Sequence, residues 1–535
     1  MERKILANKV FLFLTEFFAG MSVMAVELGA SRLLAPYFSS SQIVWTIIIG
    51  TIMIAMALGN IYGGRKADKD PNPDKLYARL IIAGIWIALI PLLGKYVIAG
   101  ISMLLVFAIN TGFLVIAAFV CCMVIFVFPL FLLGTTTPCL VKYTMSSLDD
   151  SAKTVGLLNA SNTIGSIIGT FVPTFITIPS VGTSITFLIF AGILLILSFV
   201  YFISSKIFRV RMPVAAAFFL VCVLFGHSSN FAFWNSQLTY EGESVYNYLQ
   251  VSEDDRTVSL STNVLFGVQS VYLKERELTS DYYNYALAAP YMAGVRESDS
   301  FSVLILGMGS GTYATQLQRY IGEDLSIEGV EIDKKITDLA HTYFHMDDRI
   351  RVTTYDGRAF LASTPDTYDL IMVDAYQDIT IPFQMSSLEF FSLVSSRLTD
   401  RGVMVVNLNM KSDREGSINQ YLCDTICHAF DRVYTVNVAN STNRLLFASN
   451  AADVLNTYSR NLLMETDVEI QSFLLSRVNP GIVPYEKGPY LLTDDKAPVE
   501  LLGMRVIDDL IRSEVDYYKQ VFREQGLEGL LEYLS

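Results

Sequence analysis

Residues able to hold a nucleoside recur in the second half of the chain, at the positions where strands are expected to end. A short apolar run at 303–306 is typical of a buried parallel strand, and a glycine-rich loop at 307–311 follows it. Glycines there let the backbone approach a ligand, and the N–H groups that begin the next helix point toward it. The loop residues expected to contact the ligand are Gly307, Gly309, Ser310 and Gly311.

Acidic residues follow the next three expected strands. Glu331 lies about 20 positions beyond the loop, the place from which a carboxylate binds ribose hydroxyls. Asp356 precedes Gly357 after the third strand, and Asp374 ends the fourth. Ligands of open α/β sheets bind at the carboxyl ends of the strands, so these residues predict one nucleoside site. The last two signals favour a donor of the S-adenosylmethionine type over NAD, although spacing alone leaves both open.

The elements that must position these residues form two patterns. Between 240 and 275, apolar and polar residues alternate and turn residues separate the runs, which predicts a small antiparallel β unit. From 302 onward, short apolar strands alternate with helix-like segments, which predicts a Rossmann-like α/β fold. We therefore expect a small β domain at 235–280 and a Rossmann-like catalytic domain at 281–535.

The first 230 residues differ in composition. The chain of 535 residues is 52% hydrophobic and 17% charged, and its long uncharged runs lie mostly in this first part. Runs of roughly 20 apolar residues are long enough to cross a bilayer as helices. We expect a polytopic α-helical membrane domain at 1–230 with six to eight spans. The clear candidates lie at 10–30, 43–63, 79–94, 111–134, 155–178 and 182–204, and the marginal ones at 96–110 and 213–226.

Basic residues predict how these spans are oriented, because cytoplasmic loops carry an excess of Lys and Arg. One basic cluster covers 65–79 and another covers 206–211. Six spans put both clusters, the N-terminus and the soluble half in the cytoplasm, whereas seven spans put the soluble half outside. An even number is favoured because a nucleoside donor made from ATP is available in the cytoplasm. We therefore expect a multi-pass membrane protein with a cytoplasmic catalytic domain.

The net charge and a few isolated polar residues indicate which ligands and partners the protein can bind. The formal net charge of -13 argues against nucleic acid, whose phosphates need clustered Lys and Arg. Cys423 and Cys427 lie beside His428, but a metal site needs more ligands, so we expect no metal. In the first expected span, Glu16 and Glu27 share one helix face. We interpret them as structural, with a cation or amine site as the alternative.

The ordered motifs resemble the spermidine synthase family of aminopropyltransferases. The resemblance is closest to a bacterial subgroup in which such a domain follows a membrane region similar to the major facilitator superfamily, and it covers nearly the whole chain. The stretches that carry it are 27–38 and 63–68 in the membrane half, and 244–247, 267–270, Tyr283-Asn284, 307–311, 330–333, 356–357, 373–374 and 492–500 in the soluble half. The resemblance implies an enzyme of the bacterial inner membrane. Soluble relatives commonly pair, which leaves a homodimer open.

The resemblance implies transfer of an aminopropyl group from decarboxylated S-adenosylmethionine, a co-substrate and not a prosthetic group, to an amine or polyamine. Glu331 would hold the ribose, and Asp356 with Gly357 would contact the adenine amino group. Asp374 would accept the proton of the attacking amine. The other implied contacts are Gln269 for the donor, and Tyr283, Asn284, Tyr376 and Asp378 for the amine. This displacement needs no metal.

Three departures from the family pattern keep other substrates open. Ser310 stands where the family carries an Asp that faces the aminopropyl end of the donor and would repel the carboxylate of intact S-adenosylmethionine. Gln377 replaces the second acid of a family Asp-x-x-Asp, with Asp378 one position later. Asn284-Tyr285 replaces a Gln-Glu pair, so the Glu that would bind a polyamine ammonium group is missing.

Two alternatives therefore accompany the aminopropyltransferase hypothesis. One is a methyl or aminocarboxypropyl transferase of the same fold that uses intact S-adenosylmethionine. The other is a transporter or sensor that binds a nucleoside or polyamine without turnover, which Glu16 and Glu27 motivate.

Overall fold

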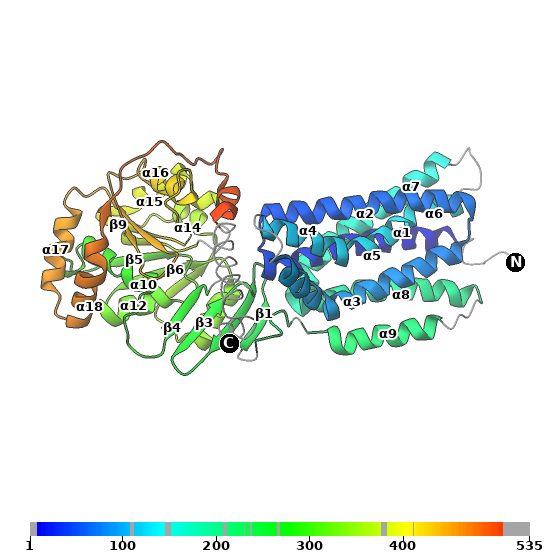
Figure 1. The fold of residues 1–535 in the computed structure, drawn as a ribbon, viewed down its shortest axis with the longest axis horizontal. Helices are drawn as coiled ribbons and strands as arrows, with labels where there is room; N and C mark the ends of the chain where they lie inside the picture. Colours follow the sequence, from blue (N-terminus) through cyan, green and yellow to red (C-terminus); the bar gives the residue numbers. More distant parts are fainter. Residues whose placement is uncertain are drawn as a thin grey trace, which may run out of the picture.

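The computed structural model describes residues 8–106, 112–144, 151–206, 211–228, 230–235, 238–264, 268–375, 382–409 and 411–506. A bundle of long helices forms one part of the molecule, and an α/β part with two sheets forms the other (Figure 1). The two parts lie end to end along the long axis. The expected fold class is confirmed: an apolar helical part, a small antiparallel sheet and a Rossmann-like α/β part.

Apolar runs form the helices of the bundle, and two of these helices start at a side-chain cap. Asn8 accepts a hydrogen bond from the N–H of Val10 at the start of α1, and Ser41 accepts one from the N–H of Val44 at the start of α2. The elements are α1 (Lys9–Phe38), α2 (Gln42–Lys69), α3 (Pro73–Val106), α4 (Phe113–Ile125), α5 (Val127–Gly134), α6 (Thr136–Thr144), α7 (Ser151–Val172), the π-helical turn η1 (Pro173–Thr177), α8 (Ile178–Ser204) and α9 (Arg211–Gly226).

Several of these helices are long and apolar enough to cross a membrane. Within the described residues they are α1, α2, α3 and the run 152–204, with the bent pair of α4 and 127–144 as a fifth if it forms one span. The run 152–204 turns back near Gly182, whose φ of 81° is not helical, and Thr177 and Thr186 meet across that turn at 2.9 Å. Helix α3 joins two segments predicted separately. The number of spans in a bilayer stays a prediction.

Helices α1 and α7 run parallel and in close contact, because α7 has glycine where the two meet. A Cβ atom on Gly165 would lie 1.9 Å from the carbonyl oxygen of Phe17, and one on Gly169 would lie 2.2 Å from that of Met21. Residue numbers increase in the same direction along both helices at these contacts, so the two helices are parallel.

Glu16, one of the two acids predicted in the first span, is fully buried between α1, α6 and α7. Its Oε1 atom accepts hydrogen bonds from Thr137 at 2.5 Å and from Asn162 at 2.8 Å. Glu27 on the same helix is half-buried. The structural interpretation thus accounts for one oxygen of Glu16, and the alternative of a cation site stays a prediction.

A small antiparallel sheet follows the bundle, with the strand order β1-β2-β3-β4. Its strands are β1 (Leu238–Glu243), β2 (Tyr248–Glu253), β3 (Thr257–Ser261) and β4 (Ser270–Leu273). Alternate residues on one face, such as Leu249 and Val258, pack against Ile336 and Phe344 of the α/β part. The small sheet is therefore held against the helix that follows β6 (Ser326–Glu331).

The main sheet has eight strands in the order β12-β10-β11-β9-β8-β5-β6-β7. Strands β7, β6, β5, β8 and β9 are parallel neighbours, and β11, β10 and β12 extend the sheet antiparallel. The remaining bounds are β5 (Ser302–Leu306), β7 (Arg351–Thr354), β8 (Tyr368–Val373), β9 (Leu398–Leu408), β10 (Arg432–Asn437), β11 (Arg444–Ser449) and β12 (Val483–Pro484). The central strands are almost wholly buried, as continuous apolar runs require.

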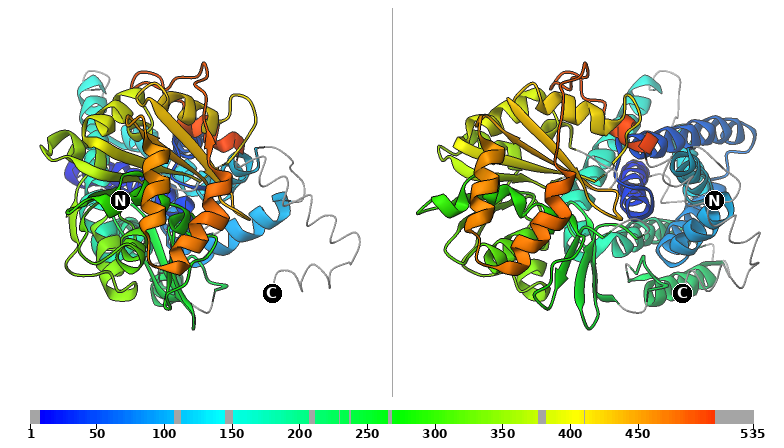
Figure 2. Two further views of the ribbon diagram at one scale, coloured as in Figure 1. Left: turned by 90° about the vertical axis from the view of Figure 1, so that its left-hand side faces the viewer. Right: turned by 60° about the vertical axis from the view of Figure 1, so that its left-hand side comes forward.

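Helices cover the sheet and alternate with the parallel strands. Figure 2 shows α17 and α18, in orange, side by side on the side of the α/β part away from the bundle. The α-helices are α10 (Tyr282–Tyr285), α11 (Ala288–Met292), α12 (Thr312–Tyr320), α13 (Lys334–Tyr343), α14 (Gly357–Ser363), α15 (Leu388–Ser396), α16 (Ile418–Ile426), α17 (Val454–Met464) and α18 (Val468–Phe473). Short turns are η2 (Val295–Glu297), η3 (Phe383–Met385), η4 (Leu474–Val478) and η5 (Asn479–Gly481).

The α/β part meets the bundle at the turn between α1 and α2. The N–H of Val264 donates to the carbonyl of Pro36 at 2.8 Å, and the N–H of Gln42 donates to Glu500 at 2.7 Å. We call this end of the bundle, which contacts the α/β part, the site end.

The basic clusters lie at the opposite end of the bundle, which corrects one premise of the orientation argument. Lys142 pairs with Asp68 at 3.0 Å, and Tyr201 donates to Asp74 at 2.8 Å, so the ends of α2, α6 and α8 and the start of α3 gather there. From the sequence, both clusters are expected on the same side as the soluble half. The difference arises because α9, treated as marginal, runs back to the site end after the second cluster (Figure 1).

Candidate active site

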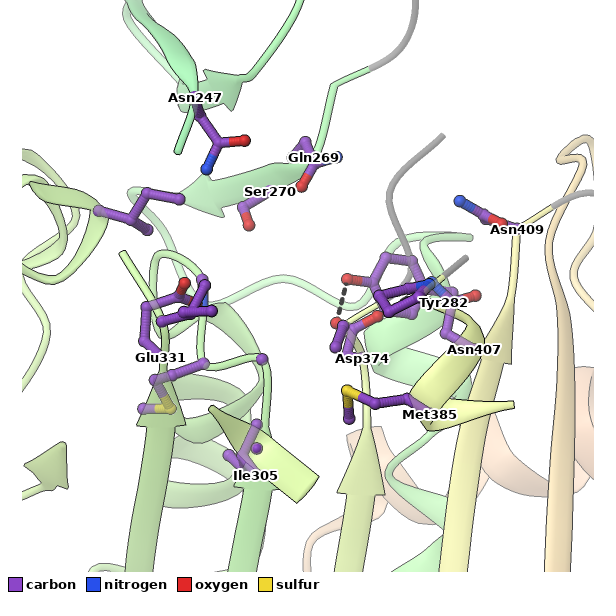
Figure 3. Close-up of a pocket in the computed structure, with 18 of the residues that line it drawn as sticks. Asn247, Gln269, Ser270, Tyr282, Ile305, Glu331, Asp374, Met385, Asn407 and Asn409 are labelled. Carbon is purple, nitrogen blue, oxygen red and sulfur yellow. Dashed lines mark hydrogen bonds between the residues drawn. The ribbon is translucent and has the colours of Figure 1, made fainter. Parts of the chain in front are cut away.

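A cavity of about 1020 Å³ lies at the edge of the main sheet where four parallel strands end. Gly307, Glu331, Asp356 and Asp374, which follow or end these four strands, all line it. Its volume is that of a small-molecule site. Figure 3 shows Glu331 and Asp374 on opposite sides of the cavity. The predicted gathering of strand ends therefore produces one site.

The loop after β5 adopts a conformation that glycine takes most easily. The φ angles are +85° at Gly307, +55° at Gly309 and +80° at Gly311. A Cβ atom on Gly307 would lie 2.7 Å from the carbonyl oxygen of Asp374, so this glycine also lets the ends of β5 and β8 stay close. Gly307 and Gly309 line the cavity, whereas Gly311 packs against Met346.

Ser310 is not among the side chains that line the cavity. It is 1% exposed, and its hydroxyl shares a 2.9 Å hydrogen bond with the hydroxyl of Thr312 at the start of α12. Thr312 and Tyr313 line the cavity instead. The position singled out for donor choice therefore lies just behind the surface that a ligand would touch.

Glu331 ends β6 and turns its carboxylate back toward the glycine loop. One oxygen accepts the N–H of Gly309 at 2.9 Å, and the other accepts the N–H of Asp333 at 3.0 Å. Burial raises the pKa of Glu331, and these two N–H groups oppose that rise because they stabilise the charged form. A carboxylate held in this way keeps lone pairs free to accept hydrogen bonds from a pair of hydroxyls.

Asp374 follows β8 on the other side of the cavity. Its Oδ2 accepts a hydrogen bond from the hydroxyl of Tyr282 at 2.6 Å, and its Oδ1 accepts one from the amide of Asn407 at 3.2 Å (Figure 3). Burial raises the pKa of Asp374 to about 7, the two hydrogen bonds oppose this rise, and the charge of Glu331 adds to it. A carboxylate with a pKa near 7 exchanges protons readily at neutral pH.

Tyr282 and Asn407 are site residues that the sequence reasoning missed. Asn407, near the end of β9, also accepts a hydrogen bond from the amide of Asn443 at 2.7 Å, so two amides in series orient Asp374. Tyr282 stays protonated as a donor, because burial and the nearby Asp374 raise its pKa well above its usual value. Two features of the sequence could have identified them. Asn407 is the polar residue near the end of a fifth apolar strand, and Tyr282 is the neighbour of Tyr283, which was predicted as a site residue.

Four more predicted residues line the cavity: Gln269, Tyr283, Asp356 and Gly357. Asp356 also caps α14, because its Oδ1 accepts the N–H of Ala359 at 2.8 Å. Among the described residues, no side chain or backbone N–H donates to its second oxygen. The hydroxyl of Tyr283 donates to Asp281 at 2.8 Å.

Of the other residues predicted for the amine, the structure describes Asn284. Asn284 is fully buried, and its amide donates to the carbonyl of Thr279 at 3.2 Å and to its hydroxyl at 2.9 Å. In this place it closes the turn before α10 and does not line the cavity. Tyr376 and Asp378 lie outside the described residues.

One wall of the cavity comes from segments that carried no site signal in the sequence. Ser40, Gln42 and Ile43 from the α1–α2 turn line it, together with residues 497–501 near the end of the described chain. The hydrogen bond from Gln42 to Glu500 joins the two segments. The helical bundle thus contributes directly to the candidate site.

The arrangement suits transfer between an adenosine-like donor and a proton-releasing acceptor. One acid at the glycine loop can accept hydroxyls, and a second, oriented acid across the cavity can accept a proton. Among the described residues, no group of three His, Cys, Asp or Glu side chains is placed to hold a metal ion.

Comparison with known proteins places residues 288–443 in the family described as the spermine/spermidine synthase domain. The chain is 50% identical over 351 residues to a "Probable polyamine aminopropyl transferase" of Bifidobacterium longum (strain NCC 2705), covering 62% of this chain and 77% of that protein. It is 24% identical over 304 residues to a "Polyamine aminopropyltransferase" of Vibrio vulnificus (strain CMCP6), covering 54% and 98%. The crystal structure of a probable spermidine synthase from Corynebacterium glutamicum ATCC 13032 aligns with a TM-score of 0.36 at 18% identity, covering 42% and 88%.

Proposed function

This chain belongs to the spermine/spermidine synthase family and is a transferase of that type, and we propose that it is a membrane-anchored aminopropyltransferase with Asp374 as its base. Its donor is decarboxylated S-adenosylmethionine, a co-substrate, and its acceptor is an amine or polyamine. The helices long enough to cross a bilayer support the membrane anchor.

The observation that carries the proposal is the setting of Asp374. The transfer is a displacement in which the amine nitrogen forms a bond to the carbon beside the sulfonium, the carbon–sulfur bond breaks, and the thioether leaves. The amine must lose a proton, and a carboxylate within reach can take it. Asp374 has a pKa of about 7, two donors fix its orientation, and it lines the same cavity as the glycine loop. Alignment of the two substrates in this cavity supplies the rest of the acceleration.

The proposed donor contacts follow the shape of the cavity. Glu331 binds the ribose hydroxyls, because its carboxylate lies beside the glycine loop. Asp356 and Gly357 contact the adenine amino group from the end of β7, and Gln269, just before β4, closes the donor side. Tyr283, with Tyr376 and Asp378 beyond the described residues, is proposed for the amine.

Replacing Asp374 by Asn tests the assignment of the base. Asp374→Asn should lower turnover by about 10²–10⁴-fold, because the amide cannot accept the proton, while the donor dissociation constant stays within a few-fold. The measurements are thioether release for turnover and titration calorimetry for donor binding. Asp348→Asn is the control, because this acid is 97% exposed and lies outside the cavity lining. Unchanged turnover in Asp374→Asn would reject Asp374 as the base.

Intact S-adenosylmethionine is the second candidate donor. It is retained as a candidate because the residue behind the glycine loop, Ser310, is neutral. A carboxylate there would repel the carboxylate of the intact donor, whereas a hydroxyl does not. Titration of the detergent-purified protein with both donors should show tighter binding of the decarboxylated form. Tighter binding of the intact form would contradict the proposal of aminopropyl transfer and would support methyl or aminocarboxypropyl transfer instead.

Ser310→Asp sharpens this comparison. The variant should weaken the intact donor far more than the decarboxylated one, because only the intact donor carries the repelled carboxylate. An equal loss for both donors would show that Ser310 plays no part in donor choice. Thr337→Asp, a second new acid that is not part of the cavity lining, controls for the added charge.

A further inference from the structure

The cations of the bundle are distributed unequally between its two ends. At the end away from the α/β part lie the starts of α1, α3, α7 and α9 and the ends of α2, α6 and α8. The described cations of these segments are Lys9, Arg65, Lys66, Lys69, Lys75, Arg79, Lys142, Lys153, Lys206 and Arg211. Toward the site end, the described bundle residues include the cations Arg32 and Lys95. We call the first group the basic end.

Hydrogen bonds confirm the assignment of residues to the two ends. At the basic end, Lys142 on α6 pairs with Asp68 on α2, and Thr15 near the start of α1 lies 3.2 Å from Tyr77 near the start of α3. These contacts join helices by the termini that carry the basic segments.

At the site end, two further contacts join the bundle to the segment after α9 and to β1. Lys95 donates to the carbonyl of Asn230 at 2.8 Å. The hydroxyl of Thr183, at the start of the long run of α8, donates to Glu243 on β1 at 2.6 Å. The α/β part is thus attached at the cation-poor end, and the two ends are separated by the full length of the helices (Figure 1).

We infer that the catalytic α/β part lies on the outer side of the membrane and that the basic end lies in the cytoplasm. Lys and Arg near the ends of spans are retained in the cytoplasm, and their asymmetry sets the orientation of the whole bundle. In this bundle, the described Lys and Arg residues near the span ends lie almost entirely at the basic end. Placing the α/β part inside would put nearly every cation near a span end on the outer side.

This orientation changes how the site meets its substrates. The α1–α2 turn forms part of the cavity wall, so the cavity lies next to the outer end of the bundle. An adenosine-based donor made in the cytoplasm must therefore cross the membrane before the reaction, and a transport step has to supply it. The inference about orientation depends on charge and fold, and it does not depend on which group is transferred.

Labelling of single introduced cysteines in intact cells tests the orientation. Asp348→Cys places a thiol on the α/β part, at a side chain that is 97% exposed, and Lys69→Cys places one at the exposed end of α2 on the basic end. A membrane-impermeant maleimide should label Asp348→Cys in intact cells, and should label Lys69→Cys only after the cells are permeabilised. The chain with its native cysteines alone supplies the background, because five of them are buried and Cys427 is partly buried.

Every other outcome overturns the inference. Labelling of Lys69→Cys alone in intact cells would place the α/β part in the cytoplasm. Labelling of both thiols, or of neither, would exclude a single orientation with this part outside. Alkaline phosphatase fused after the last residue gives an independent reading, since that enzyme is active only outside the cytoplasm. Activity of the fusion is expected, and its absence, with a fused fluorescent protein that folds inside, contradicts the inference. Neither experiment measures the transfer reaction, so failure of the proposed function is recognised separately.

Discussion

At the scale of single residues, the candidate site depends on how two carboxylates in one cavity are held differently. Glu331 accepts two backbone N–H groups, whereas Asp374 accepts one phenol and one side-chain amide. Burial raises the pKa of both, but for Asp374 the value reaches about 7. The two acids are therefore suited to different tasks: Glu331 to binding neutral hydroxyls and Asp374 to taking up a proton.

With Asp374 as the proposed base, the expected pH dependence of the rate follows from its pKa. A base works only when deprotonated, so kcat/KM should be low below its pKa and rise to a plateau above about pH 7. Tyr282→Phe removes a hydrogen bond that stabilises the charged carboxylate, so the pKa of Asp374 should rise further and the midpoint should move to higher pH by on the order of one unit. The measurement is the initial rate across the pH range with saturating donor and with the amine well below its KM, which reports kcat/KM for the amine.

Tyr283→Phe is the matched control for this experiment. Its hydroxyl donates to Asp281 and not to Asp374, so its loss should leave the midpoint unchanged even if amine binding weakens. A midpoint that moves equally in both variants, or that moves to lower pH in Tyr282→Phe, would contradict the assignment of the titrating group.

At the scale of elements, α1 and α7 form a closely packed helix pair in the bundle. Gly165 lies against the backbone of Phe17, so Gly165→Ala should force the two helices apart and destabilise the protein by about 1–3 kcal/mol. Gly156 on the same helix has open space around its Cα, so Gly156→Ala should be neutral or slightly stabilising. Thermal unfolding in detergent measures both. Equal unfolding temperatures for the two variants would show that the close contact does not limit stability.

At the scale of the whole molecule, a chain of contacts joins the bundle to the donor side of the cavity. Arg32, near the end of α1, donates to the backbone carbonyls of Ser244 and Val245 between β1 and β2. The hydroxyl of Ser244 donates to Asp333 at 2.5 Å, and the N–H of Asp333 donates to Glu331. Arg32 is therefore placed to position Glu331, the acid proposed to bind the ribose, while lying outside the cavity lining itself.

Replacing Arg32 tests this positioning role. Arg32→Gln should raise the KM for the donor several-fold with little change in kcat or in the pH midpoint, because Asp374 lies outside the chain of contacts. Arg32→Lys should recover part of the loss, since an ammonium can still donate to a carbonyl. Arg65→Gln at the basic end is the control for the same change of charge. Loss of kcat without a change in KM would contradict a role in donor positioning.

Much of the fold and part of the site could be predicted from local patterns. Apolar runs, alternation and glycine spacing depend on neighbouring residues, and they correctly indicated the apolar helices, the small antiparallel sheet and the parallel strands with Gly307, Glu331, Asp356 and Asp374 at their ends. These features are local because burial and backbone geometry dictate which residue types each strand or loop accepts.

Only the tertiary structure decided what joins these elements. The hydrogen bond from Tyr282 to Asp374 and the cavity wall from Ser40 to Ile43 bring together residues far apart in the chain. The side chain of Asn284 turns to Thr279 and not into the cavity, which reverses its expected direction. The same holds for the course of α9, which moved the α/β part to the end of the bundle away from the basic clusters. A sequence pattern specifies which face of an element is apolar or polar, but which elements share those faces depends on how the whole chain packs.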